Sequence, residues 1–239
     1  MTLVLNEDER ILKESASTFF EKKDPLKILR VLRKTPGIGF DKELWQEMTE
    51  MGWAGVLVSE KYGGSEFGYR GIGQILEEAG RRLVSSPLIS TGLIGARLIE
   101  AIGSLGQKEK YLPSICKGEL LCALALDESG RHAPDAIKSS AERVQDNFRL
   151  NGEKPFVMDG QSADKFIVAA RVLEVGQQKN NITLFVVDKE VNGLQRDSLN
   201  MVDGRGGARL KLNDVVISRK DILGEIHKGT QPLEQILDS

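Results

Sequence analysis

The chain has 239 residues, of which 40% are hydrophobic and 28% are charged, an ordinary composition for a soluble globular protein. Its length is sufficient for one large or two small domains with a real core. The net charge of −2 gives no reason to expect nucleic acid or an anionic membrane as a partner. No apolar run approaches the ~20 residues that span a bilayer, and the start MTLVLNEDER lacks the features of a signal peptide, so a cytoplasmic protein is the default expectation.

The first half of the chain carries helical patterns. Asn6 is suited to cap a helix whose first turn is acidic, where the helix dipole favours negative charge, and whose apolar face ends near Lys23. A second short helix is expected to follow Pro25. A third is expected to start at the cap residue Asp41 and to close at Gly52.

Two more helices and a shorter one follow. The clearest spacing of three and four is formed by Ile72, Ile75, Leu76, Ala79 and Leu83. The pattern repeats from Ile94 to Ile102, with Ser90 or Thr91 as the expected cap. The segment GQKEKYLPSICKGE predicts one further short helix, with Pro113 near its middle or at a break.

From Leu120 onward the pattern changes to that of strands. The segments that predict them are LCALAL, RLNGEK, DKFIVAA, ITLFVV and ARLKLNDVVI. The Asn151-Gly152 pair predicts a type I′ hairpin turn. Residues 232–239 predict the first two turns of an amphipathic helix with little to pack against, whose apolar residues are Leu233, Ile236 and Leu237.

Several segments, in this order, resemble the acyl-CoA dehydrogenase family. They are MGWAGVLVSEKYGG, EEAGRRL, GQKEKYLPSICKGELLCALALDE, NGEKPFVMDGQSADKFIVAAR and LNDVVISRKDILGE. The resemblance implies an α+β chain with an N-terminal all-helical domain (1–119) and an antiparallel β-barrel-like domain (120–222). Residues 223–239 are then a linker and the first turns of a truncated C-terminal helical domain.

The resemblance also implies a function. The family uses FAD to desaturate an acyl-CoA thioester: a carboxylate removes the α-proton while the flavin takes the β-hydride. The implied partners are the acyl-CoA substrate, an electron-transfer flavoprotein as electron acceptor, and further subunits of a homo- or hetero-oligomer. In the family the carboxylate comes from the C-terminal helices, so no catalytic residue is assigned in this chain.

The resemblance places the flavin against two strands. Leu124 and Leu126 are implied to contribute backbone groups, and Asp127 stands where the family has a hydroxyl. An ionised Asp127 accepts hydrogen bonds but donates none, and it opposes the negative charge of a reduced flavin. Alternatively, Asp127 is a surface carboxylate at a strand end. On the opposite wall Phe156 keeps an aromatic face and Met158 replaces a second hydroxyl; alternatively, both belong to the barrel core.

The loop SGRHAPD departs from the family pattern. Arg131 offers charge-assisted hydrogen bonds to a phosphate of the substrate, or is simply solvated. The neighbouring His132 is weak evidence for catalysis. The acidic pair Glu77-Glu78 suggests acid–base chemistry, but the amphipathic pattern favours a solvated helix face.

The two cysteines and the absence of common motifs bear on disulfide bonding and on other classes of functional site. Cys116 and Cys122 allow a disulfide, but two buried free thiols are favoured. The sequence has no glycine-rich phosphate motif, no cysteines at metal spacing and no G-x-S-x-G elbow. Two hypotheses remain: an FAD-dependent acyl-CoA dehydrogenase that is incomplete in this chain, and a non-catalytic subunit of a heteromeric dehydrogenase with a degraded flavin site.

Overall fold

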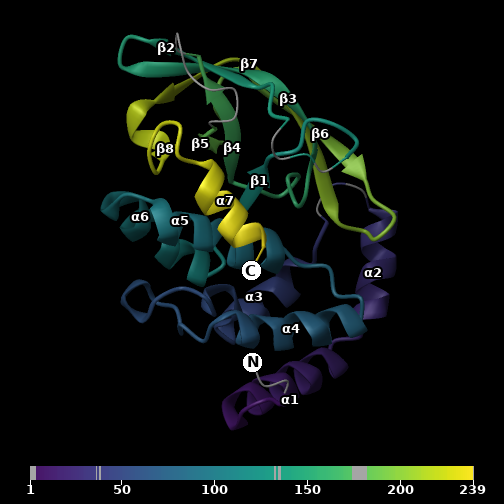
Figure 1. The fold of residues 1–239 in the computed structure, drawn as a ribbon. Helices are drawn as coiled ribbons and strands as arrows, with labels where there is room; N and C mark the ends of the chain where they lie inside the picture. Colours follow the sequence, from purple (N-terminus) through teal and green to yellow (C-terminus); the bar gives the residue numbers. More distant parts are fainter. Residues whose placement is uncertain are drawn as a thin grey trace.

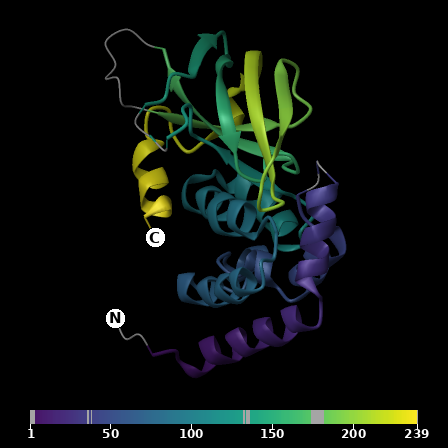
Figure 2. The same cartoon turned by 90° about the vertical axis from the view of Figure 1, so that its right-hand side faces the viewer.

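The computed structural model describes residues 4–35, 37, 39–131, 133, 136–173 and 182–238. His132 lies outside these described residues. Figures 1 and 2 show the helices of the first half gathered below the strands of the second half, with the C-terminal helix returning to the helical side. The predicted order of helices followed by a β module is therefore confirmed.

The N-terminal helices are α1 (Glu7–Glu21), α2 (Pro25–Lys34), α3 (Lys42–Glu50) and α4 (Tyr69–Arg81). The first three start where the sequence predicts. The Asn6 side chain accepts a hydrogen bond from the Glu9 N–H at 2.8 Å, and the Glu9 carboxylate accepts one from the Asn6 N–H at 2.9 Å, which is a capping box. Asp41 caps α3 by accepting from Leu44 N–H at 2.8 Å. These starts were predictable because capping is local.

The following helical segment differs from the prediction. A π-helix, η3 (Leu88–Gly95), runs into α5 (Ala96–Ile102), and neither Ser90 nor Thr91 caps a helix. The Thr91 hydroxyl accepts from the Cys122 N–H at 3.0 Å and donates to the Cys122 carbonyl at 3.1 Å. The Ser90 hydroxyl lies 2.7 Å from the Asp159 carboxylate. The predicted cap was wrong because Thr91 binds the backbone of Cys122 and Ser90 binds the side chain of Asp159 instead.

The remaining helical elements are short. They are α6 (Leu105–Cys116), which contains Pro113, α7 (Thr230–Leu237) and the 3-10 turns η1 (Trp53–Gly55), η2 (Glu60–Tyr62) and η4 (Arg219–Asp221). Pro113 stands inside α6 rather than at a break, because the helix continues for another turn after it.

The second half forms one sheet. Its strands are β1 (Cys122–Ala125), β2 (Ser140–Val144), β3 (Asn147–Val157), β4 (Lys165–Val172), β5 (Thr183–Asp188), β6 (Leu194–Asn200), β7 (Gly206–Ser218) and β8 (Ile222–Leu223). The order is β6-β7-β3-β2-β4-β5-β8, with β1 paired to β4. The sheet is mixed: β1 and β2 run parallel to β4, and the other pairs are antiparallel. The segments predicted as strands correspond to β1, β3, β4, β5 and β7. The polar β6 and the shorter β2 and β8 were missed.

The predicted hairpin turn at Asn151-Gly152 was wrong. The β2–β3 hairpin turns at Gln145 and Asp146, where Gln145 has a φ of +56°. Asn151 and Gly152 lie inside β3, at a register shift against β7. The Asn151 amide exchanges hydrogen bonds with Asp214 on β7, at 3.1 and 2.8 Å. This pair therefore forms a bulge, which uses the same glycine freedom that a turn would.

The C-terminal helix is buried, contrary to the prediction. Leu233 is 2% exposed and Ile236 8% exposed. Both belong to a core cluster that also contains α5, α6 and sheet residues such as Leu98, Leu112 and Leu184. Only Leu237 remains partly exposed. The helix finds its partner in α5, so its apolar face adds little to the exposed surface.

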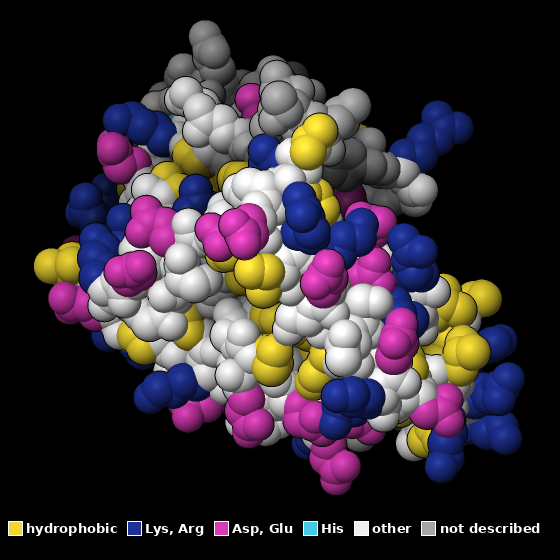
Figure 3. Space-filling view, turned by 90° about the horizontal axis from the view of Figure 1, so that it is seen from below, with side chains coloured by type: hydrophobic (Ala, Val, Ile, Leu, Met, Phe, Trp, Pro, Cys, Tyr) yellow, Lys and Arg dark blue, Asp and Glu magenta, His cyan; other side chains and the backbone are white. Residues whose placement is uncertain are grey.

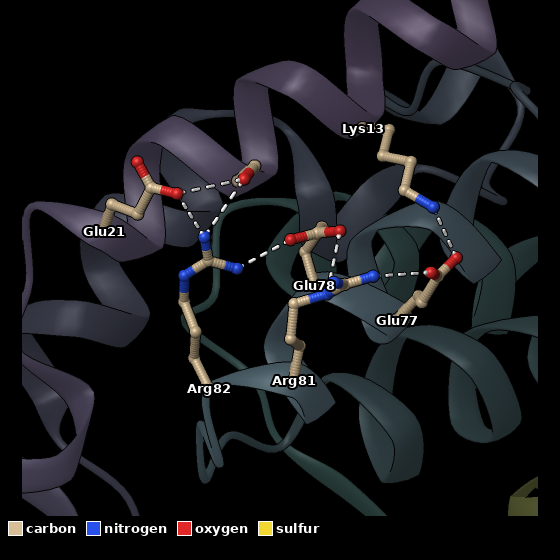
Figure 4. A network of polar contacts seen from close by, with 7 residues as sticks. Lys13, Glu21, Glu77, Glu78, Arg81 and Arg82 are labelled. Carbon is tan, nitrogen blue, oxygen red and sulfur yellow. Dashed lines mark hydrogen bonds and ion pairs between the residues drawn. The ribbon is translucent and has the colours of Figure 1, made fainter.

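The acidic pair on α4 is split between two environments. Glu77 is half-exposed and pairs with Lys13 of α1 at 2.7 Å. Glu78 is only 4% exposed and pairs with Arg82 at 2.6 Å and Arg81 at 3.5 Å (Figure 4). The prediction of a solvated face was therefore right for Glu77 and wrong for Glu78, which lies between α1 and α4.

Both cysteines are free thiols, as the sequence favoured. Burial raises the pKa of Cys122 to about 12 and that of the less buried Cys116 to about 11. Such thiols are protonated and unreactive at neutral pH.

Candidate cofactor site

A single cavity gathers the residues that were predicted for the flavin. It has a volume of about 180 Å³ and is lined by Ser90, Ile94, Leu124, Leu126, Asp127, Phe156, Met158 and Leu237. The predicted residues lie at the end of β1 and at the end of β3. They meet because both strand ends reach this cavity. The sequence did not identify Ser90, Ile94 or Leu237. The first two stand four apart on one helical face, but nothing in the pattern indicates which way that face points.

The walls of the cavity are largely apolar. Leu126 is buried, whereas the Phe156 ring is 40% exposed. Phe156 is therefore not a core residue, and the barrel-core alternative fails for it. Met158 is half-buried, and its sulfur lies 3.3 Å from a guanidinium nitrogen of Arg205. An aromatic ring edge flanked by a flexible thioether suits a flat, apolar ligand surface.

Asp127 is the carboxylate at the rim. It is partly buried, and its Oδ1 accepts from the Ala133 N–H at 3.3 Å. This contact ties the strand end to the loop that follows. The side chain lines the cavity while holding its own loop, so it is not a free surface carboxylate.

A second carboxylate stands behind the cavity wall. Asp159 is 6% exposed, and its Oδ2 lies 2.7 Å from the Ser90 hydroxyl, which is also 3.1 Å from the Pro87 carbonyl. Burial raises the pKa of Asp159, against the hydrogen bond from Ser90 and the charge of Arg205, which act to lower it. An ionised Asp159 competes with Pro87 for the single Ser90 proton, whereas a protonated one donates to Ser90 and satisfies both contacts.

Arg131 is not brought to the cavity. It is exposed, and its backbone N–H and carbonyl are bound by the Ser129 hydroxyl at 3.3 and 2.8 Å. Its predicted contact with a substrate phosphate stays a prediction. His132 lies outside the described residues.

A larger cavity, of about 660 Å³, contains none of the predicted residues. It lies between α3 and the chain segments before β1 and after β3, with Trp45, Gly118, Gln161 and Lys189 among its lining residues. The Trp45 indole donates to the Gly118 carbonyl at 3.2 Å, so its one polar group is already satisfied. Size alone does not make this cavity the functional site.

Two other classes of site find no support in the described part of the chain. There, no cluster of histidine, cysteine and acidic side chains is arranged to hold a metal ion. None of the described helices combines the length and the hydropathy needed to cross a membrane.

Comparison with known proteins decides the family. The model of the acyl-CoA dehydrogenase N-terminal domain matches residues 6–119, and that of the acyl-CoA dehydrogenase middle domain matches residues 123–217. The chain belongs to the acyl-CoA dehydrogenase family. Acyl-CoA dehydrogenases are FAD-dependent flavoproteins, so the cofactor expected from the sequence is the cofactor of the family.

The chain is similar to characterised members along most of its length. It is 31% identical to 3-(aryl)acrylate reductase from Clostridium sporogenes over 80% of this chain and 52% of that protein. It is 30% identical to mitochondrial isovaleryl-CoA dehydrogenase from Pongo abelii over 98% of this chain and 57% of that protein. The chain thus spans little more than half the length of these curated relatives.

Solved structures agree with this fold. An acyl-CoA dehydrogenase from Geobacillus kaustophilus superimposes with a TM-score of 0.85 at 29% identity, covering 99% of this chain and 63% of that one. A variant of the steroid acyl-CoA dehydrogenase Tcur3481-Tcur3483 superimposes with a TM-score of 0.83 at 27% identity, covering 97% and 60%.

The residues present fit part of a flavin. Closed small-molecule sites usually measure ~300–1,000 Å³, so a cavity of about 180 Å³ suits one region of the cofactor rather than all of it. Apolar side chains and an exposed aromatic edge suit the ring system. The fit is poorer for polar contacts, because Asp127 and Met158 both lack the hydroxyl donor that the resemblance implies at these positions.

Proposed function

We propose that this chain is the helical and β portion of an FAD-dependent acyl-CoA dehydrogenase-like flavoprotein that acts on an acyl-CoA thioester. The observation that supports the proposal is the convergence of Leu124, Leu126, Asp127, Phe156 and Met158 on one cavity. These residues lie on or directly after two separate strands, β1 and β3, and the family resemblance singles them out. Alternative roles, such as core packing or surface charge, give no reason for them to share a cavity.

The residues of the chain would serve to bind and orient rather than to move protons. The bound flavin supplies the hydride acceptor. Leu124, Leu126 and Met158 offer apolar surface that excludes water from the reacting carbons, and Phe156 packs against a ring edge. Holding the acyl group and the cofactor in contact accounts for much of the acceleration in such reactions. We assign no catalytic base, because the family takes it from helices beyond the two matched domains.

The remaining expectations are part of the same proposal. We propose a domain division at 1–119, 120–222 and 223–239, an electron-transfer flavoprotein as electron acceptor, assembly into a homo- or hetero-oligomer, and a cytoplasmic location. Arg131 is proposed to bind a phosphate of the substrate, since its guanidinium is exposed and free to form charge-assisted hydrogen bonds.

The test uses a protein of the same length as its relatives. We expect this protein to be yellow and to bleach when an acyl-CoA is added without oxygen. If it binds FAD but no acyl-CoA changes its spectrum, the dehydrogenase assignment is wrong.

A second candidate is a non-catalytic subunit of a heteromeric dehydrogenase. It is favoured by Asp127 and Met158, because neither side chain supplies the hydroxyl donor that the resemblance implies at its position in the flavin site. On this proposal, the full-length protein is colourless alone and gains flavin only in a complex with a partner. Stoichiometric FAD in the isolated full-length protein rules it out.

A substitution test separates the two candidates at the site itself. Under the second candidate, Asp127→Thr with Met158→Thr restores two hydroxyl groups and removes a negative charge, so FAD retention improves. We expect a gain of about tenfold in affinity, the equivalent of two hydrogen bonds of modest strength. If retention is unchanged, the hydroxyl positions are not what limits flavin binding.

A further inference from the structure

The side chain of Lys154, on β3, has no exposed surface. Its ammonium donates to the Leu126 carbonyl at 3.1 Å, to the Ala169 carbonyl at 2.7 Å and to Glu128 Oε1 at 2.6 Å. A lysine ammonium has three N–H donors, so every donor is used. Burying an ammonium is costly unless it is paired and hydrogen-bonded. The chemistry proposed above makes no use of this group.

The position of the ammonium in the sheet is informative. The parallel pairing of β1 with β4 ends at Ala125 and Val168. The next residue on each strand is Leu126 and Ala169, and the ammonium binds both of their carbonyls. The side chain therefore continues the contact between the two strands at the point where backbone pairing stops.

The chain returns to β4 close to where it left. Strand β2 pairs in parallel with β4 at Ser140↔Arg171 and Ala141↔Val172. Since β5 occupies the other edge of β4, β1 and β2 share one edge. The chain leaves this edge after β1 and rejoins it at β2, and we call its described residues there, 126–131, 133 and 136–139, the excursion. The Lys154 ammonium lies between the point of departure and the point of return.

Glu128 joins the start of the excursion to its end through hydrogen bonds. Its two carboxylate oxygens accept from the Ser139 N–H at 3.0 and 3.2 Å, and one of them also accepts from the Lys138 N–H. Burial acts to raise the pKa of Glu128, but hydrogen bonds from Lys154 and Ser139 outweigh it and hold the pKa below its ordinary value. The carboxylate is therefore ionised at neutral pH and joins the first residues of the excursion to its last.

We propose that Lys154 and Glu128 form a clamp that positions Leu126 and Asp127 at the wall of the cofactor site. Leu126 and Asp127 line the cavity and lie between the last paired residue of β1 and Glu128. Neither Lys154 nor Glu128 lines the cavity, so both are positioning residues rather than catalytic ones. The part of this inference that concerns FAD rests on the proposed function.

The test removes both charges together. Removing one partner of a buried pair leaves an uncompensated charge, whereas replacing both is often tolerated. Lys154→Met with Glu128→Gln suits this purpose, because methionine fills the space of the lysine stem and glutamine still accepts from the Ser139 N–H. The matched control is Lys165→Met with Asp188→Asn, which removes a more exposed lysine–carboxylate pair joining β4 and β5.

Three measurements on the full-length protein distinguish positioning from simple stabilisation. They are the melting temperature, the rate of tryptic cleavage after the exposed Arg131, and the FAD dissociation constant well below the melting temperature. For the double variant we expect a rise of about tenfold or more in both the cleavage rate and the dissociation constant, which corresponds to about 1.4 kcal/mol. For the control we expect less than about twofold in either.

Each outcome bears on the clamp. A lower melting temperature with unchanged cleavage and FAD affinity shows a merely structural pair and overturns the inference. If the double variant does not fold, Glu128→Gln alone replaces it, since Lys154 then keeps both carbonyl bonds; unchanged cleavage and affinity in that variant also overturn the inference. If the unmodified protein binds no FAD, the proposed function fails, but the cleavage rate still decides whether the clamp holds the excursion.

Discussion

The candidate cofactor site differs at single residues from the pattern that the family resemblance implies. Two carboxylates, Asp127 and Asp159, stand around a cavity whose other walls are mainly apolar. The carboxylate of Asp127 accepts a hydrogen bond from the Ala133 N–H. Asp159 is buried, which raises its pKa, while the hydrogen bond from Ser90 and the charge of Arg205 act to lower it. The ionisation of Asp159 should therefore matter for stability.

We expect Asp159→Asn to stabilise the protein at neutral and higher pH. Because the folded-state pKa of Asp159 is raised, the favourable contribution of its protonated form is complete below the unfolded-state pKa and is lost as pH rises through the folded-state pKa. Asparagine cannot ionise and avoids this loss. The gain in unfolding free energy should be on the order of 1 kcal/mol near neutral pH and should vanish in acid.

Urea unfolding at two pH values checks this expectation. Asp203→Asn serves as the control, because Asp203 is an exposed carboxylate that accepts a hydrogen bond from the Arg205 N–H, which asparagine can also accept. Its effect should be small and similar at both pH values. An equal gain for Asp159→Asn in acid and at neutral pH would show that packing, and not ionisation, is responsible.

Among the elements, α1 combines buried apolar side chains such as Phe20 with charged contacts to α4. Figure 4 shows Glu78 between Arg81 and Arg82, with Arg82 reaching Glu21 on α1 and Glu77 reaching Lys13. Glu78 is buried and Glu77 is half-exposed, so neighbouring acids of identical type differ in environment. Substituting each acid in turn therefore tests how burial affects the strength of an ion pair.

Glu78→Ala is expected to destabilise the protein more than Glu77→Ala. Removing Glu78 breaks a partly buried ion pair and should cost about 2 kcal/mol of unfolding free energy. Removing Glu77 breaks exposed pairs, which are worth about 0–1 kcal/mol. Chemical denaturation gives both values. Similar costs for the two variants would mean that burial does not set the strength of this contact.

For the molecule as a whole, the burial of α7 makes the exposed apolar surface smaller than the sequence predicted. Leu233 and Ile236 pack into the core, so they do not add to an exposed apolar patch. Figure 3 shows one face on which hydrophobic side chains are interspersed with charged ones. Apolar side chains remain exposed on α2, where Leu26 is 49% and Val31 55% exposed and no residue is fully buried.

Residues 1–239 by themselves should be catalytically silent, should self-associate, and should bind FAD weakly. The related proteins are longer, and the cavity of about 180 Å³ encloses only part of a flavin, so the dissociation constant should exceed that of a full-length protein by at least about tenfold. Exposed apolar side chains such as Leu26 and Val31 promote association. Light scattering and a flavin titration check both points; a clean monomer with tight FAD binding contradicts them.

The sequence alone determined the features that depend on neighbouring residues. Caps at Asn6 and Asp41, the helix with Ile72 and Ile75, and the strand segments follow from local hydrogen bonds and side-chain periodicity. Family resemblance then selected Leu124, Leu126, Asp127, Phe156 and Met158. None of these predictions needs a contact between distant segments of the chain.

Only the tertiary structure decided which role a residue takes when its sequence pattern is compatible with more than one. The Asn151-Gly152 pair forms a bulge rather than a turn because β7 lies alongside it. Ser90 binds Asp159 in the turn after β3, and Thr91 binds the backbone of β1, so neither residue caps a helix. Lys154 has the sequence context of an ordinary strand lysine, yet it is fully buried by carbonyls and a carboxylate from distant segments. A side chain with several possible partners takes the one that folding brings near, and long-range contacts leave no periodic signal in the sequence.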